Sequence, residues 1–92
     1  MEFDWDEGNE AKNLKHGVHD WEIEEALDDP DFRHGDNRVI DGELRQTGFG
    51  RSGTTGNYLR IIYTMRSRAG RLRVRPISAV QMTATERARY LR

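Results

Sequence analysis

The chain has 92 residues, of which 35% are hydrophobic and 34% charged, and it contains no cysteine. Its length suits one small domain with a single core over residues 1–92, and the lack of cysteine excludes disulfides and thiolate metal sites. No apolar run approaches the roughly 18 residues of a membrane helix. The acidic start lacks the basic and then apolar order of a signal peptide, so we expect a cytoplasmic protein that does not bind membranes.

The net charge of −1 hides a strong asymmetry along the chain. Residues 1–43 contain 15 acidic and 4 basic residues, whereas residues 44–92 contain 11 arginines, no lysine and one acid, Glu86. Such asymmetry is typical of a protein whose basic half meets a polyanion. Arginine suits phosphate because its planar fork donates two parallel hydrogen bonds. The alternative is that the acidic half packs beside the basic half and neutralises it.

The acidic half predicts a short strand followed by two helices. Phe3 and Trp5 alternate with acids, which suits a strand. A first helix is expected over residues 6–17, with Asp6 as its N-cap and Gly17 at its end. A second helix is expected over Asp20–Leu27. Its expected buried side chains are Trp21, Ile23, Ala26 and Leu27, and its expected solvated ones are Glu22, Glu24 and Glu25.

The rest of the chain predicts a β-meander and a last helix. Residues 30–42 are polar and suggest a loop around one short strand near Val39 and Ile40. Strands are then expected over residues 44–49, 59–66 and 71–77, the last two paired antiparallel through a short turn. Thr83 and Glu86 form a capping box that opens a helix ending near residue 91. The expected fold class is α+β: a strand, two N-terminal helices, a meander and a C-terminal helix.

Period-two alternation gathers arginines on one face of the expected meander, because alternate residues of a strand point to opposite faces. The arginines on this face are Arg45, Arg60, Arg66, Arg73 and Arg75, and Arg87 lies nearby if the last helix packs at the sheet edge. Tyr63 and Tyr90 add aromatic surface. Arginine interleaved with aromatic rings favours single-stranded nucleic acid, whereas a solvated polar sheet face is the alternative.

Two further sequence patterns do not indicate a nucleotide-binding or metal-binding site. Residues 48–53 have the glycine spacing of a dinucleotide-binding loop, but a strand follows them instead of a helix, so we interpret them as an inter-strand loop. The three histidines do not fall at metal-binding spacing, so no metal or other cofactor is expected.

Short stretches spread over nearly the whole chain resemble one known family. They are residues 3–6, Asn13-Leu14-Lys15-His16-Gly17-Val18, Glu22-Ile23-Glu24-Glu25-Ala26, Asp29-Pro30, Gly50-Arg51-Ser52, Tyr63-Thr64-Met65-Arg66, Arg75-Pro76-Ile77-Ser78-Ala79, and Thr83 with Glu86, Arg87 and Tyr90. Through these residues the chain resembles the BrnT family of bacterial type II toxins, the ribonuclease partners of BrnA antitoxins. The resemblance implies a fold similar to RelE-type toxins and a metal-independent endoribonuclease that inhibits translation. It also implies a ribbon-helix-helix antitoxin of the BrnA type, and promoter DNA bound only by the toxin–antitoxin complex.

Metal-free RNA cleavage requires proton transfer at the ribose hydroxyl and the leaving oxygen, and stabilisation of a negatively charged phosphorane. His16 is the histidine inside the family-like motifs and is the candidate acid or base. Arginines are the candidates to bind the phosphate. Tyrosines are the candidates to stack a base or to donate a proton. The expected catalytic residues are His16, Tyr63, Arg66 and Arg75, and the expected RNA-binding residues are Lys15, Arg45, Arg60, Arg73, Arg87 and Tyr90.

Val80 departs from the family pattern, in which an arginine commonly follows Ile-Ser-Ala. A catalytically weakened protein that binds an antitoxin and regulates its promoter is therefore the alternative function. In that interpretation the arginine face docks an acidic antitoxin segment. A third hypothesis is a stand-alone RNA or DNA binder, whose affinity would fall steeply with salt.

Overall fold

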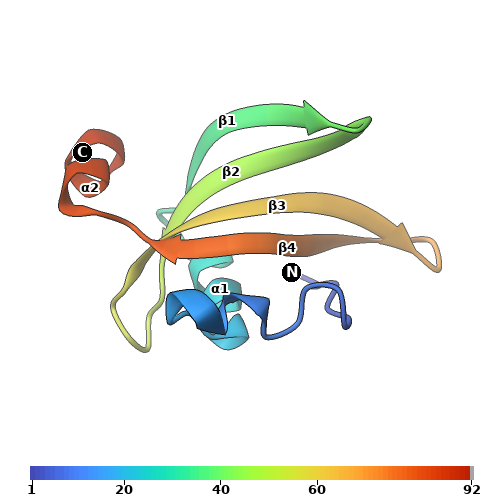
Figure 1. The fold of residues 1–92 in the computed structure, drawn as a ribbon, viewed down its shortest axis with the longest axis horizontal. Helices are drawn as coiled ribbons and strands as arrows, with labels where there is room; N and C mark the ends of the chain where they lie inside the picture. The colour runs from blue at the N-terminus through green and yellow to red at the C-terminus, as the bar shows by residue number, and fades with distance from the viewer. Residues whose placement is uncertain (92) are drawn as a thin grey trace.

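Figure 1 shows a computed structural model of the protein, which describes residues 1–91. Four consecutive strands form an antiparallel sheet in chain order, and the α+β class is confirmed. The strands are β1 (Arg33–Ile40), β2 (Glu43–Arg51), β3 (Tyr58–Arg68) and β4 (Arg71–Gln81). Helix α1 (Asp20–Leu27) packs on one face of the sheet, the 3-10 helix η1 (Lys12–His16) lies beside β4, and α2 (Ala84–Tyr90) follows β4 at one end.

Two tight turns fix the twist and register of the meander. Asp41 and Gly42 connect β1 to β2, and Ala69 and Gly70 connect β3 to β4. All four residues have positive φ, between 51° and 79°. Two-residue turns with positive φ at both positions match the right-handed twist of the strands they join.

The core lies between α1 and the middle of the sheet. Burying one aliphatic side chain contributes about 1.5–3 kcal/mol, which exceeds the worth of a surface ion pair. Packing of α1 against β2 and β3 therefore holds the two layers together. The buried cluster consists of Val18, Ile23, Ala26, Leu27, Leu59, Ile61, Tyr63, Val74 and Ala79.

Two glycines of β2 allow close contacts on the core face, Gly50 with α1 and Gly48 with the ring of Phe32. A Cβ on Gly50 would lie 2.0 Å from the backbone oxygen of Ala26, and a Cβ on Gly48 would lie 1.9 Å from the ring of Phe32. These glycines belong to a buried strand, so the expectation that residues 48–53 form an inter-strand loop is wrong for residues 48–51.

The first predicted helix, over residues 6–17, is wrong in both its type and its length. Only the 3-10 helix Lys12–His16 forms there, ended by Gly17 at a positive φ of 74° as expected. The side chains of Asn9 and Asn13 explain the difference, because they hydrogen-bond the backbone of β4. Asn9 donates to the carbonyl of Pro76, and Asn13 accepts from the amide of Ala79. These side chains anchor the segment to β4, while its backbone amides bond locally in turns, as Glu10 does to the carbonyl of Asp6. The structure therefore has one N-terminal α-helix instead of two.

The predicted strand at Phe3 is present only as an isolated parallel bridge to Val74. The short strand expected near Val39 and Ile40 is present but longer, because β1 extends over residues 33–40 of the predicted loop. Most side chains of β1 are exposed, so its sequence lacks the apolar alternation that marks a half-buried strand.

The faces of α1 differ from the expectation as well. Trp21, expected in the core, is 45% exposed, whereas Glu22, expected in solvent, is 2% exposed. Glu22 accepts hydrogen bonds from Thr55 and Asn57. Glu25 accepts hydrogen bonds from the hydroxyl and amide of Thr54 and from the hydroxyl of Ser52, which lower its pKa. These glutamates therefore anchor the β2–β3 loop to the helix.

Substitution of Gly50 by alanine tests the close approach of α1. The added methyl group would overlap the backbone of Ala26, so Gly50→Ala is expected to lower the free energy of unfolding by about 1–3 kcal/mol or more. Gly53→Ala is the matched control, because a Cβ there meets no atom within 4 Å. Urea unfolding followed by circular dichroism measures both; equal midpoints for the two variants would contradict the packing described.

Candidate nucleic-acid interface

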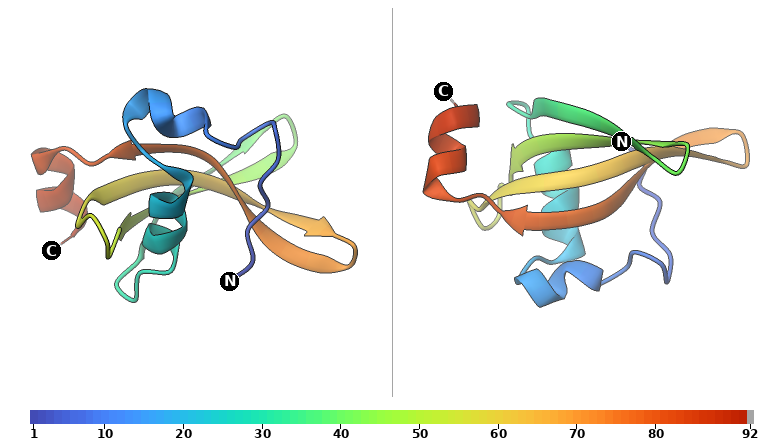
Figure 2. Two further views of the ribbon diagram at one scale, coloured as in Figure 1. Left: turned by 90° about the horizontal axis from the view of Figure 1, so that it is seen from below. Right: turned by 45° about the horizontal axis from the view of Figure 1, so that its top comes forward.

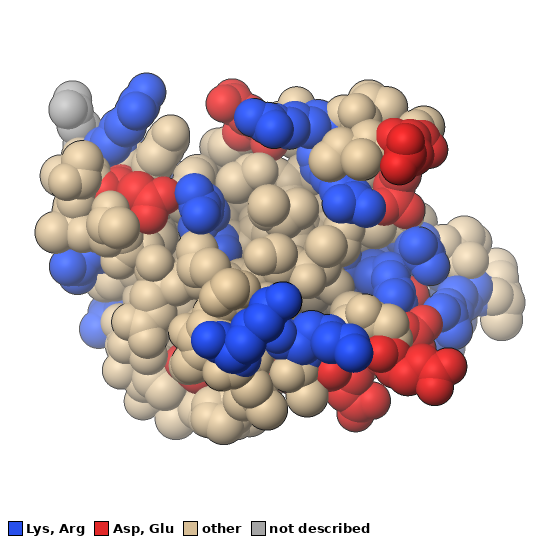
Figure 3. Space-filling model, in the orientation of Figure 1, with Lys and Arg blue, Asp and Glu red and all other residues tan. Residues whose placement is uncertain are grey.

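A groove of about 480 Å³ crosses the sheet face opposite α1. In Figure 3 it corresponds to the tan surface at the centre of the view, bordered by blue arginine atoms. All four strands and α2 contribute to it. Its lining residues are Gly35, Asp36, Arg38, Ile40, Arg45, Thr47, Phe49, Arg60, Ile62, Ile77, Ser78, Glu86 and Tyr90.

A β-bulge shapes the floor of the groove. Ile62 pairs with Ser78 and Tyr63 pairs with Pro76, which leaves Ile77 as the extra residue of β4. Proline cannot donate to a ladder, and a bulge bends the strand that carries it. The bulge thus accompanies the turn of Ile77 toward the groove.

Helix α2 forms one end of the groove. The ring of Tyr90 stacks on Phe49 of β2 with centroids 4.4 Å apart. The predicted capping box is confirmed: Thr83 accepts from the amide of Glu86, and Glu86 accepts from the amide of Thr83. The second carboxylate oxygen of Glu86 lies 3.2 Å from Nη1 of Arg60. One side chain therefore both starts the helix and faces a groove arginine.

Three guanidinium groups line the groove, and their charges are only loosely compensated. Arg45 lies 3.3 Å from Glu43, and Arg60 pairs with Glu86. The side chains of both arginines remain 34–45% exposed, and an exposed ion pair contributes at most about 1 kcal/mol. Arg38 has no ion-pair partner among residues 1–91. A phosphate group can therefore compete with the two glutamates for these cations.

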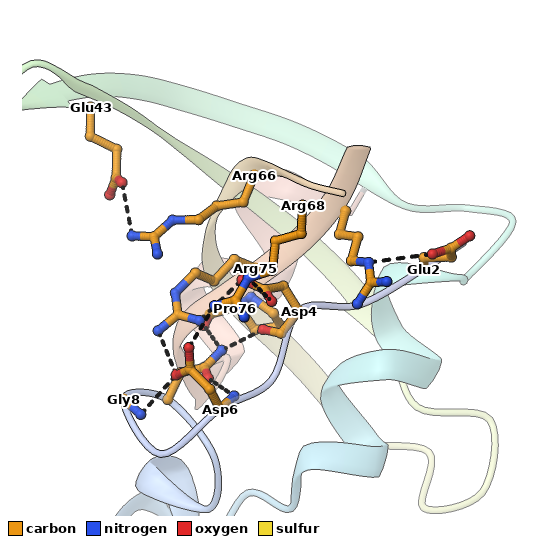
Figure 4. Close-up of polar contacts among 11 residues, drawn as sticks. Glu2, Asp4, Asp6, Gly8, Glu43, Arg66, Arg68, Arg75 and Pro76 are labelled. Carbon is orange, nitrogen blue, oxygen red and sulfur yellow. Dashed lines mark hydrogen bonds and ion pairs between the residues drawn. The ribbon is translucent and has the colours of Figure 1, made fainter. Parts of the chain in front are cut away.

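Three further arginines of the predicted face pair with acids, Arg73 and Arg75 with the N-terminal segment and Arg66 with Glu43 of β2 (Figure 4). The strand register places Arg66, Arg73 and Arg75 on the groove side of the sheet, as the alternation predicted. Arg66 pairs with Glu43 and Arg73 with Glu2. Arg75 has an 11% exposed side chain, and its role in catalysis stays a prediction.

A four-charge cluster of Asp4, Asp6, Arg68 and Arg75 fastens the N-terminal segment to the sheet. Arg75 lies 3.1 Å from Asp4 and 2.9 Å from Asp6, and Arg68 lies 2.9 Å and 2.8 Å from the same two carboxylates. Asp4 is 2% exposed. Hydrogen bonds from Arg75 and the amide of Gly8 hold the pKa of Asp6 far below its ordinary value. The pKa of Arg75 is raised chiefly by Asp6.

The other predicted site residues lie outside the groove. Lys15 and His16 are exposed on η1, which lies beyond β4 in Figure 1. Tyr63 is on the core face, where burial raises its pKa and its hydroxyl is 3.5 Å from Nδ1 of His34. The guanidinium of Arg87 lies over the ring of Tyr58. The groove thus brings together Arg45, Arg60 and Tyr90 from the predicted set.

Sequence reasoning missed Arg38 and Glu86 as groove residues. Arg38 was expected in a loop, where strand alternation does not assign a side chain to a face. Glu86 was assigned only to the capping box of the last helix. The spacing of Glu86 and Tyr90 could have predicted that both face the same surface, because residues four apart lie on one side of a helix.

A larger hollow of about 710 Å³ lies beside α1. Its charged lining consists of Glu24, Glu25, Asp28, Asp29 and a single cation, Arg51, which does not suit a polyanion. Within the described chain, no three His, Asp or Glu side chains are grouped to hold a metal ion. No helix of residues 1–91 has the length and apolar character needed to cross a bilayer.

Fold and groove together define a small α+β protein with an arginine-lined, aromatic-edged groove on its sheet. The family model for BrnT, the ribonuclease toxin of type II toxin–antitoxin systems, matches residues 5–86. Because this match covers most of the chain, the protein belongs to the BrnT family of ribonuclease toxins, which implies an antitoxin partner. No curated protein matches the chain.

The charge cluster at the N-terminus predicts how the stability of the fold changes at low pH. The folded-state pKa of Asp6 lies below the ordinary value of 3.8, so its contribution to stability is present above that value and is lost as the pH falls below it. The free energy of unfolding should therefore decrease below about pH 4, and less steeply in Asp6→Asn. Urea unfolding of both proteins between pH 7 and pH 3 measures this; parallel pH profiles would contradict it.

Proposed function

We propose that the protein is a metal-independent endoribonuclease toxin that inhibits translation in the cytoplasm, and that single-stranded RNA lies in the groove. The observation that carries the proposal is the convergence of Arg38, Arg45 and Arg60 with Glu86 and Tyr90 on the sheet face opposite α1. Guanidinium groups suit phosphate, and an aromatic ring supports a stacked base.

The groove residues match the steps of RNA cleavage. The ribose 2′-oxygen attacks the adjacent phosphorus as the bond to the 5′-oxygen breaks, which leaves a 2′,3′-cyclic phosphate and a 5′-hydroxyl. Arg45 and Arg60 stabilise the charge of the phosphorane. Glu86 is the candidate base for the 2′-hydroxyl proton, because it lies 3.2 Å from an arginine able to hold the phosphate. Tyr90 is the candidate donor to the leaving oxygen or the stacking platform.

This assignment moves the acid–base role away from His16. η1 lies beyond β4, and His16 is not among the groove-lining residues. Arg75 is assigned to holding Asp4 and Asp6, because a phosphate would have to displace two carboxylates from a largely buried guanidinium. The RelE-like fold remains part of the proposal, as do a ribbon-helix-helix antitoxin and promoter binding only by the complex.

A catalytically weakened toxin that serves as an antitoxin-binding module is the second candidate. Val80 favours it, because it is the cross-strand partner of Arg60 and stands where the family commonly carries arginine. The groove therefore has one guanidinium fewer than the family pattern would give it.

Substitutions in the groove test the first candidate. Glu86→Gln keeps a capping-box residue but removes the carboxylate charge, and Arg45→Ala removes one phosphate donor. Each is expected to lower the RNA cleavage rate by about 10²-fold or more. Arg71→Ala, at the exposed end of the β3–β4 hairpin, is the charge-matched control and should cleave normally. Cleavage is measured on single-stranded RNA with excess EDTA, and a loss of activity in EDTA would contradict metal independence.

Val80→Arg separates the two candidates. A guanidinium placed beside Arg60 should raise the cleavage rate of a weak enzyme by at least about tenfold, because it adds charge stabilisation at the phosphate. Growth arrest and RNA integrity after induction of each protein in a bacterium provide the cellular measurement. Wild-type protein that leaves RNA intact, together with cleavage by Val80→Arg, would favour the binding module.

A further inference from the structure

The two edge strands of the sheet each carry a β-bulge, one on either side of the groove. The right-hand view of Figure 2 shows β1 and β4 as these edges, with α1 behind the sheet. Besides the bulge of β4 at Ile77, the register of β1 shifts so that Gly35 and Asp36 together stand opposite Thr47. Thr47 pairs with Ile62, which borders the bulge of β4. The two bulges therefore lie at one level of the sheet, and bulges commonly redirect side chains beside active sites.

The bulge of β1 holds a carboxylate in the groove. Gly35 and Asp36 both line the groove, although neighbouring residues of a regular strand point to opposite faces. A Cβ on Gly35 would lie 2.9 Å from the ring of Phe49, so the backbone of the bulge rests directly on that ring. Phe49 is 3% exposed and is stacked with Tyr90. The backbone that carries Asp36 is therefore fixed against a buried ring.

Asp36 and Arg38 are the charged groove residues whose side chains have no partner. Neither forms a side-chain hydrogen bond or ion pair within residues 1–91, and both are exposed to solvent. The other charged residues of the groove, Arg45, Arg60 and Glu86, are all in ion pairs. Because Arg45 and Arg60 are assigned to the phosphate, Asp36 and Arg38 are available to contact a base.

The chemistry of these two side chains selects one nucleobase. A carboxylate accepts two parallel hydrogen bonds, and guanine presents two adjacent donors, N1–H and the N2 amine. A guanidinium donates two parallel hydrogen bonds, and guanine also presents two adjacent acceptors, O6 and N7. No other base of RNA presents both pairs. Residues two apart on a strand are separated by about 7 Å, which is close to the length of a purine, so both side chains can reach one base.

The floor of the groove supplies an apolar surface for the flat face of a base. Ile40, Ile62 and Ile77 line it, and Ile40 is 39% exposed. Ligand sites typically combine such an apolar surface, which packs against the ligand, with a few polar groups that fix its orientation. The groove has both features at the level of the two bulges.

We propose that Asp36 and Arg38 recognise a guanine next to the scissile phosphate. The carboxylate of Asp36 accepts from N1–H and the N2 amine, and Arg38 donates to O6 and N7. The inference rests on the proposed function for the place of RNA in the groove, and it adds the class of substrate, single-stranded RNA that contains guanine. Contacts to phosphate position a nucleic acid and contacts to bases specify it, so cleavage and sequence selectivity depend on different side chains.

Four RNA oligonucleotides that differ at one base test the proposal. Within an otherwise guanine-free sequence they carry guanine, hypoxanthine, 7-deazaguanine or adenine. Hypoxanthine lacks the N2 amine and 7-deazaguanine lacks N7, so each loses hydrogen bonds to one of the two charged side chains. The wild-type protein should cleave the guanine oligonucleotide at least about tenfold faster than each of the others.

Substitutions assign each preference to its side chain. Asp36→Asn should remove the preference for guanine over hypoxanthine, because an amide offers one acceptor oxygen, and should keep the preference over 7-deazaguanine. Arg38→Ala should have the reverse effect. Asp41→Asn, in the β1–β2 turn outside the groove, is the charge-matched control and should keep both preferences. Circular dichroism and urea midpoints verify folding, and ratios of rates are compared within each variant.

Equal cleavage of the guanine and hypoxanthine oligonucleotides by the wild-type protein would overturn the inference. An unchanged preference in Asp36→Asn would also overturn it, and a general loss of rate in that variant would instead make Asp36 a catalytic acid or base. Single-stranded DNA counterparts lack the attacking 2′-hydroxyl, so fluorescence anisotropy with them measures base recognition without cleavage. A guanine preference in this binding, with no cleavage of RNA, would contradict the proposed function and support recognition by Asp36 and Arg38. Loss of both would contradict both proposals.

Discussion

The pairing of the acidic N-terminal segment with the arginines of β3 and β4 is the interaction that allows so many cations to share one face of the sheet. Arginines side by side on one face repel one another, and that repulsion must be offset within the fold or by a ligand. Asp4 and Asp6 offset it for Arg68 and Arg75 at distances of 2.8–3.1 Å, with Asp4 itself buried. The same contacts hold the first residues against the outer edge of β4, which would otherwise be open.

Both interpretations of the charge asymmetry hold, each in a different part of the molecule. At the hairpin end, acids of the first half neutralise the arginines that the second half supplies. In the groove, Arg45 and Arg60 meet half-buried glutamates at the solvent boundary, and Arg38 meets no acid in the described chain. Arg75 differs from the groove arginines in burial, because its side chain is only 11% exposed and contacts two carboxylates. A ligand that displaced those carboxylates would leave a largely buried charge uncompensated.

The sequence predicted the elements whose signals are local. The strands around Ile61 and Val74 alternate with period two, and Thr83 with Glu86 forms a cap within four residues. Predictions failed where the partner lies far along the chain. Glu22 is buried only because Thr55 and Asn57 reach it from the β2–β3 loop, 33 and 35 residues away. The groove was only partly predicted, because the bulge at Ile77 and the docking of Tyr90 on Phe49 have no signature in a single sequence.

Helix α2 has seven residues, fewer than a helix needs to persist alone in water. Its position therefore depends on a few attachments, chiefly the Tyr90–Phe49 stack and the Glu86–Arg60 pair. Local opening of such a segment costs much less than global unfolding. The groove can accordingly lose its aromatic wall while the sheet stays intact, so amide exchange is expected to be faster in α2 than in the strands. A ligand that bridges the helix and the sheet would gain affinity from the order it imposes there.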